Sequence, residues 1–85
     1  MNRKKLLKKL AIGAVRNVAF ADMVNLVEGF GFGLSRVNGS HHIFAHTDIC
    51  ELLNLQNVKG KAKPYQIRQL LRLVERYNMR LENSE

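Results

Sequence analysis

Apolar residues recur at helical spacing in three stretches of the chain. The first runs from Arg3 to about Ala11, where Leu6, Leu7 and Leu10 lie on one side and lysines occupy the rest. A helix this short is not stable alone, so it must either dock on the body or fray. The second is predicted from about Ala21 to Gly29, with apolar residues at i, i+3, i+4, i+7 and i+10: Phe20, Met23, Val24, Val27 and Phe30.

The third helix begins at Pro64, because proline suits the first turn of a helix. Its apolar stripe consists of Ile67, Leu70, Leu71, Val74 and Tyr77, and we expect Tyr77 to be part of the core. Its basic ridge, spaced four apart and away from that stripe, consists of Arg68, Arg72 and Arg76. Residues 79–85 are expected to form a short extended tail.

Between the second and third helices the pattern changes to alternation, which is typical of strands. Residues 32–37 and 40–45 alternate around Asn38-Gly39, a strong hairpin signal because both turn residues accept positive φ. A two-residue turn there would place Arg36 opposite His41. A third strand is expected within Cys50 to Val58, followed by a basic loop over residues 59–63.

This register assigns each side chain of the hairpin to a face. One face would carry Phe32, Leu34, Arg36, His41, Ile43 and Ala45; the other would carry Ser35, Val37, Ser40, His42, Phe44 and His46. We expect the first set to be covered by helices, with Arg36 and His41 at its rim. A slip of one residue would exchange the two histidines. The element order predicts an α+β domain, in which helices cover one face of a three-stranded antiparallel sheet.

Positive charge is concentrated at the two ends of the chain, whose net charge is +7 over 85 residues. Residues 1–16 carry six Lys/Arg and no acid, and residues 59–80 carry seven Lys/Arg against Glu75. The segment between them has Arg36 against four acids. Such an arrangement favours a polyanionic partner, nucleic acid first. The alternative is that the lysines serve only to keep a small protein in solution.

Other features of the sequence exclude several classes of protein. The single cysteine, Cys50, cannot form an internal disulfide, and we expect it to be a half-buried residue of a protein in a reducing compartment. Lys8 and Lys9 interrupt the first apolar stretch, so neither a signal peptide nor a membrane span is predicted and the expected location is the cytoplasm. The glycines of residues 29–33 follow a helix and precede a strand, which favours a helix cap over a phosphate loop.

Three histidines and the cysteine also have the side chains of a metal site. However, His41 and His42 are adjacent on a strand and point to opposite faces, and the chain has no Cys-x-x-Cys pair. Neither His46 nor Cys50 changes that conclusion, so no metal or other cofactor is predicted.

The segment Gly-Phe-Gly-Leu-Ser-Arg-Val-Asn-Gly-Ser-His-His-Ile-Phe, residues 31–44, closely resembles the hairpin of the HicA-like (YcfA-like) RNA-cleaving toxins. In that family a Gly-Ser-His segment opens the second strand. The resemblance covers residues 20–77, with the flanking helices in the family's order. It implies a double-stranded-RNA-binding-like α-β-β-β-α fold and metal-independent cleavage of mRNA through a histidine. It also implies inhibition by a HicB-like antitoxin.

The resemblance divides the chain into a basic N-terminal extension (1–19), a HicA-like domain (20–78) and a tail (79–85). The sequence departs from the family pattern in three places. The N-terminal basic helix is additional, Thr47 follows His46 where many members have proline, and residues 54–61 replace a segment containing proline and histidine. The chain therefore resembles a divergent branch of the family.

By position in the motif, His41 corresponds to the family's active histidine and Gly39 to the turn glycine before it; His42 is the alternate. A histidine suits proton transfer because the ordinary pKa of its side chain, about 6.5, lies near neutrality. Arg36 is expected to hold the phosphate, and further charge stabilisation is expected from Lys59, Lys61 and Lys63. Contacts to RNA farther along the chain are expected from Tyr65, by stacking, and from Arg68 and Arg72.

Three functions are compatible with these features. The first is a toxin-type endoribonuclease that cleaves RNA with His41. The second is an RNA-binding module of the same fold without cleavage. The third is a partner-binding protein whose basic surfaces serve only an acidic, antitoxin-like chain.

Overall fold

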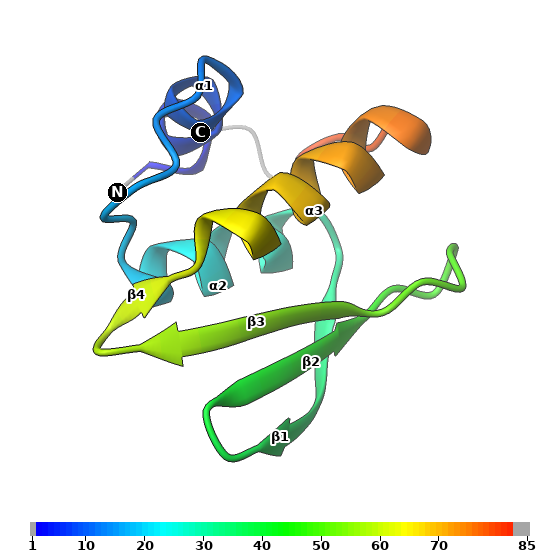
Figure 1. Ribbon diagram of the computed structural model, residues 1–85. Helices are drawn as coiled ribbons and strands as arrows, with labels where there is room; N and C mark the ends of the chain where they lie inside the picture. Colours follow the sequence, from blue (N-terminus) through cyan, green and yellow to red (C-terminus); the bar gives the residue numbers. More distant parts are fainter. Residues whose placement is uncertain (1, 83–85) are drawn as a thin grey trace.

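The chain forms an α+β fold of three helices and a four-stranded antiparallel sheet (Figure 1). The structure, a computed structural model, describes residues 2–82. The helices are α1 (Arg3–Ala11), α2 (Phe20–Gly29) and α3 (Pro64–Arg76). The strands, in their order across the sheet, are β1 (Gly33–Asn38), β2 (His41–Ala45), β3 (Leu53–Val58) and β4 (Lys61–Ala62).

The prediction of three strands was one strand short. Residues 61 and 62, expected within a basic loop, pair with Val58 and Asn57 of β3. The connection is a two-residue turn in which both Lys59 and Gly60 have positive φ, 52° and 82°. Such a turn matches the twist of paired strands, so the chain folds back at once as β4.

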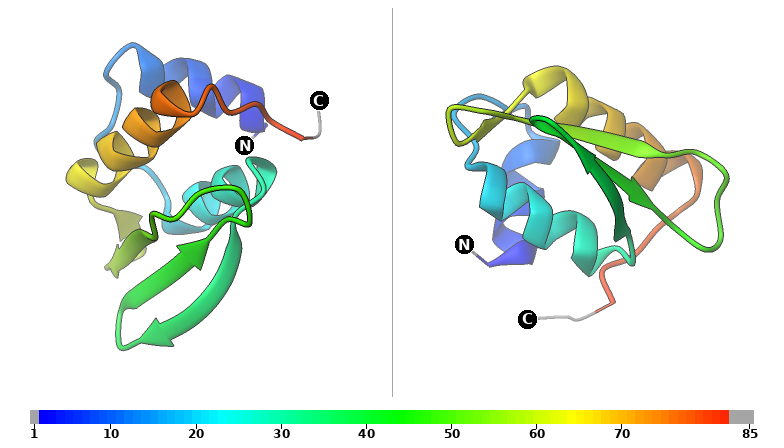
Figure 2. Two further views of the ribbon diagram at one scale, coloured as in Figure 1. Left: turned by 90° about the vertical axis from the view of Figure 1, so that its right-hand side faces the viewer. Right: turned by 90° about the horizontal axis from the view of Figure 1, so that it is seen from below.

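Helices α2 and α3 cover one face of the sheet, and α1 packs against α2 on the side away from the strands (Figure 2). Every helix and strand except β1, whose six residues are all exposed, contributes apolar side chains to a single core. The most buried of them are Leu10, Met23, Leu26, Val27, Phe44, Leu53, Leu55, Ile67 and Leu70. No helix in the described part of the chain covers the opposite face, which is hereafter called the open face (Figure 2). None of the helices within residues 2–82 is long and apolar enough to cross a membrane.

The short helix α1 is docked, and its contacts show how. Leu6 and Leu10 are only 4% and 1% exposed and belong to the common core. The side chain of Asn2 accepts a hydrogen bond from the Lys5 amide at 3.0 Å, which caps the helix. The Arg3 Nε donates to the Asn25 carbonyl of α2 at 2.8 Å. Tertiary packing thus supplies the stability that a nine-residue helix lacks by itself.

The hairpin forms where the sequence predicted it, but its register differs from the prediction. Asn38 pairs with His41, so the turn residues are Gly39 and Ser40 in place of Asn38 and Gly39. Gly39 has φ of +62°, whereas Ser40 is not among the residues with positive φ. This combination matches a type II′ turn, which needs glycine only at its first central position. Arg36 therefore pairs with Ile43, and the prediction that it faces His41 was wrong.

The prediction of which hairpin face the helices cover was also wrong. Phe44 is 1% exposed and pairs with Leu53 of β3, itself fully buried, so this is the helix-covered face. Directly paired residues share a face and successive residues alternate, so His41 and Ile43 lie on the open face. A register shift between Leu34 and Arg36 moves Leu34 opposite Phe44, onto the other face from Arg36. Phe44, opposite Leu53, thus occupies the helix-covered position that the prediction had given to the face of Ile43.

At the edge of the sheet formed by β3 and β4, backbone groups form hydrogen bonds with a side chain and with a backbone segment. Gln66, a buried polar residue of α3, accepts a hydrogen bond from the Gln56 amide at 2.6 Å. Beyond β4, the Phe20 amide donates to the Gly60 carbonyl and the Ala62 amide donates to the Val18 carbonyl. These bonds pair backbone groups that a two-residue strand would otherwise leave without partners.

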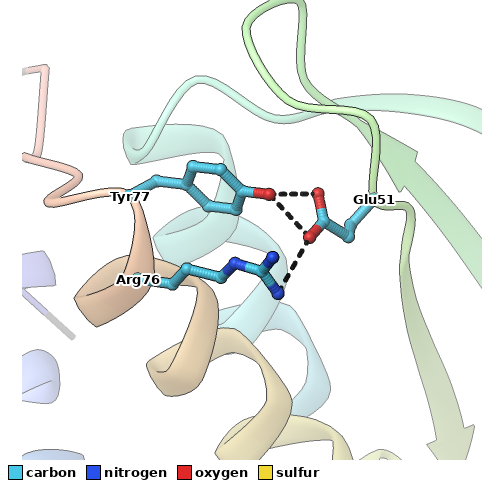
Figure 3. A network of polar contacts seen from close by, with 3 residues as sticks. All are labelled: Glu51, Arg76 and Tyr77. Atoms are coloured by element: carbon cyan, nitrogen blue, oxygen red, sulfur yellow. Dashed lines mark hydrogen bonds and ion pairs between the residues drawn. The ribbon is translucent and has the colours of Figure 1, made fainter.

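Two further expectations, that Tyr77 belongs to the core and that Cys50 is half-buried, were wrong. Tyr77 is 38% exposed, and its hydroxyl donates to both carboxylate oxygens of Glu51 at 2.6 Å (Figure 3). Arg76 lies 3.5 Å from the same carboxylate. Cys50, expected to be half-buried, is exposed. Of the tail expected over residues 79–85, the described part, residues 79–82, contains neither helix nor strand, and Met79 and Leu81 pack against the core; residues 83–85 lie outside the described residues.

Candidate active site

The sheet topology gathers the two hairpin turns at one end of the sheet. Strand β1 ends and β2 begins at the Gly39-Ser40 turn, and β3 ends and β4 begins at the Lys59-Gly60 turn (Figure 1). The Asn57 amide donates to the Ser40 carbonyl at 2.9 Å, which ties the two turns together. His41, the first residue of β2, therefore lies on the open face at the end of the sheet that carries the lysines.

The His41 ring contacts a side chain of the neighbouring strand. His41 pairs with Gln56 through the backbone, and its Nδ1 lies 3.1 Å from Oδ1 of Asn54, two residues away on the same face of β3. Gln56 Nε2 donates to the Ser40 hydroxyl at 3.2 Å, which links β3 to the turn that precedes β2. The sequence did not single out Asn54 or Gln56, because their significance depends on the pairing of β2 with β3.

His42 lies on the opposite face, where it packs against α2. Its ring centroid is 4.8 Å from that of Phe20, at an interplanar angle of 60°. Its Nδ1 lies 3.3 Å from the Ser40 carbonyl. His42 pairs with Leu55, a fully buried residue. These surroundings assign His42 a packing role under the helix layer.

His46 is held in a structural role at the far end of the sheet. Its Nε2 lies 3.1 Å from the Phe30 carbonyl, and its Nδ1 accepts a hydrogen bond from the Asp48 amide at 3.0 Å. Both ring nitrogens are thus used within the protein, with Nε2 carrying the proton. His46 and Tyr77 line a surface hollow there, well away from His41. Within residues 2–82 no three His, Cys, Asp or Glu side chains lie close enough to hold a metal ion.

Two of the predicted phosphate-binding cations share the face of His41. Lys61 pairs with Val58, which lies two residues beyond Gln56, and Gln56 pairs with His41. Arg36 pairs with Ile43, the next residue of β2 on that face. Lys59 is exposed at the tip of the β3–β4 turn. Lys63 is exposed as the N-cap of α3, one residue beyond β4.

The remaining predicted contacts lie on α3, and the structure does not bring them to the open face. Arg68 and Arg72 are exposed, as the sequence predicted for the basic ridge, and Tyr65 is exposed too. Helix α3 covers the opposite side of the sheet from His41 (Figure 2). These three residues therefore do not share the face that carries His41, Arg36 and Lys61.

The open-face group has the components of acid–base chemistry on an anionic substrate. It combines one imidazole, whose orientation a neighbouring amide fixes, with cations able to neutralise charge on a phosphate. In comparisons with known proteins, no family model, curated protein or solved structure matches the chain significantly. The fold and the site thus define a small α+β domain that bears a histidine on the uncovered face of its sheet.

Proposed function

We propose that this chain is a small metal-independent endoribonuclease of the HicA-like kind, with His41 as its acid/base group. The observation that carries the proposal is the position of His41. It lies on the open face, at the sheet end where Lys59 and Lys61 gather, and Asn54 holds its ring. His42 and His46, by contrast, are used in packing and internal hydrogen bonds.

The reaction requires a base, an attacking hydroxyl and a stabilised phosphate. The neutral His41 ring takes the proton of a ribose 2′-hydroxyl, and the 2′-oxygen attacks the adjacent phosphorus. The bond from phosphorus to the 5′-oxygen breaks, and the leaving oxygen takes a proton from the imidazolium or from water. The products are a 2′,3′-cyclic phosphate and a free 5′-hydroxyl. Arg36 and Lys61 offset the charge that develops on the phosphate. Acid–base help of this kind contributes about 10²–10⁴-fold to a rate.

The biological role in this proposal is that of a toxin in a toxin–antitoxin pair. The support is the resemblance of residues 31–44 to the HicA-like hairpin, together with the order α2, β1, β2, β3, β4, α3, which, with the two-residue β4 as an addition, is compatible with the α-β-β-β-α order of a double-stranded-RNA-binding-like fold. A HicB-like antitoxin would silence the protein by covering the open face around His41. Acidic groups on that partner would complement Arg36 and the turn lysines.

The test compares wild type with His41→Ala and His42→Ala after induction in cells, with growth and RNA integrity as readouts. We expect wild type to arrest growth and degrade mRNA, and His41→Ala to be harmless while still folded. His42→Ala should retain cleavage wherever it folds but should unfold at a lower temperature, because it loses its contact with Phe20. Loss of cleavage in folded His42→Ala alone would overturn the assignment of His41.

If all three proteins leave RNA intact, the chain is not a nuclease. Salt-sensitive RNA binding that is indifferent to His41→Ala would then favour a non-catalytic RNA-binding module. RNA binding no stronger than that of a generic polycation would favour a protein whose basic surfaces serve only a partner chain.

A further inference from the structure

The contact between His41 and Asn54 has the geometry by which proteins select one tautomer of a histidine. We propose that Asn54 is a positioning residue, whose side-chain oxygen accepts a hydrogen bond from His41 Nδ1–H and so leaves the Nε2 lone pair free as the base. The contact itself does not depend on the proposed function. Its consequence for catalysis rests on that function.

The tautomer follows from the two atoms that meet in this contact. His41 Nδ1 and Asn54 Oδ1 are 3.1 Å apart, within hydrogen-bond distance. An amide oxygen has lone pairs and no hydrogen, so the proton between them must be on Nδ1. In a neutral imidazole the other nitrogen, Nε2, is then the acceptor. A free histidine in water prefers the opposite form, with the proton on Nε2, so the tautomer at this site is one that the protein imposes.

Asn54 is suited to this role because the strand that carries it is fixed. Its neighbours Leu53 and Leu55 are both fully buried in the core, which sets the position of the Asn54 backbone. Gln56, the other polar residue of β3 on this face, bonds to Ser40 and leaves the His41 ring to Asn54. The Asn54 side chain is half-buried, so water competes less for the bond than at an exposed site.

The tautomer decides whether His41 can begin the proposed reaction. With Nδ1 protonated and bonded to Asn54, Nε2 is the nitrogen that can take the 2′-hydroxyl proton. Removing the amide lets the ring rotate and lets the tautomer revert. We therefore expect Asn54→Leu, which keeps the approximate shape of the side chain, to lower the cleavage rate by at least about tenfold. The upper bound is the 10²–10⁴-fold that general acid–base catalysis typically contributes.

The experiment reads the tautomer directly, without RNA. Long-range ¹H–¹⁵N NMR of the imidazole nitrogens is recorded at about pH 8.5, where histidines of ordinary pKa are neutral, on wild type, Asn54→Leu and Asn54→Asp. Loss of one set of signals in His41→Gln assigns the ring. His46 provides an internal reference of the opposite tautomer, because its Nε2 faces the Phe30 carbonyl and its Nδ1 accepts from the Asp48 amide.

We expect His41 to carry its proton on Nδ1 in wild type and in Asn54→Asp, whose carboxylate also only accepts. In Asn54→Leu the Nε2–H form should grow, while His46 stays unchanged in all three proteins. The proposal is overturned if wild-type His41 is in the Nε2–H form, because the amide would then be donating. It is equally overturned if Asn54→Leu leaves the tautomer as it was. Absence of cleavage by wild type would instead refute the proposed function, since the NMR result needs no activity.

Discussion

Lys59 occupies a backbone conformation that is unfavourable for a lysine. Its φ is +52°, and with Gly60 at +82° it forms the two-residue turn between β3 and β4. A left-handed conformation costs a residue with a Cβ roughly 1–2 kcal/mol, and such turns favour asparagine or glycine at this position. Replacing Lys59 therefore tests whether the chain keeps its positive charge here at the expense of stability.

The substitution Lys59→Asn should separate the two effects. Asparagine tolerates the left-handed region, so we expect the free energy of unfolding to rise by about 0.5–1 kcal/mol. For a domain of this size that is an increase in Tm of roughly 2–8 °C. If Lys59 contacts a phosphate, the variant should bind single-stranded RNA more weakly. The slope of log K against log salt concentration should then fall by up to about 0.7, the value for one phosphate contact.

The assay is thermal unfolding by circular dichroism, together with fluorescence anisotropy of a labelled single-stranded RNA across a salt series. Lys61→Asn is the matched control, because Lys61 lies in β4 and is not among the residues with positive φ. It should lose RNA affinity without gaining stability. If Lys59→Asn is no more stable than wild type, the reasoning from backbone strain is refuted. If it is more stable but binds RNA with an unchanged salt slope, Lys59 is not a phosphate contact.

Two further predictions concern the packing of α1 and the hydrogen bond between Tyr77 and Glu51. Leu10→Ala should lower the free energy of unfolding by about 2–5 kcal/mol, because Leu10 is only 1% exposed. The control Ile12→Ala, at a residue that is 84% exposed, should change it by less than about 0.5 kcal/mol. Equal effects of the two variants in denaturant titrations would show that α1 does not belong to the core. The hydrogen bond from Tyr77 to Glu51 lowers the pKa of the carboxyl and raises that of the phenol. A lowered pKa contributes stability that is lost as pH falls through the folded value, and a raised pKa contributes stability that is lost as pH rises through it. Tyr77→Phe should therefore be less stable than wild type mainly between about pH 5 and pH 10, and a difference that persists unchanged at pH 2 would contradict this bond as its source.

The sequence predicted the elements well because local chemistry determines them. The helical spacing of apolar residues located both ends of α1 and α2 to within about one residue. Pro64 begins α3 as expected, and the alternation on either side of Gly39 located the hairpin. These features depend on neighbours a few residues away, so they can be inferred without knowing the fold.

The register could not be predicted in the same way, because the sequence offers two turns of equal length. Asn38-Gly39 and Gly39-Ser40 are both acceptable two-residue turns, and both use the glycine. The choice between them also has to fit the contacts that the strands make elsewhere. In the observed pairing Phe44 of β2 lies between Leu34 of β1 and Leu53 of β3, and a bulge near Ser35 shifts the pairing of the rest of β1.

The candidate site, too, was predictable only in its local features. The sequence by itself determined that His41 follows a tight turn, that lysines surround Gly60, and that basic residues lie at both ends of the chain. Only the tertiary structure decided that His41 lies on the uncovered face and that Asn54 meets its ring. The reason is physical: a strand fixes only the alternation of its side chains, whereas which face is buried and which residue lies opposite depend on packing against segments distant in the chain.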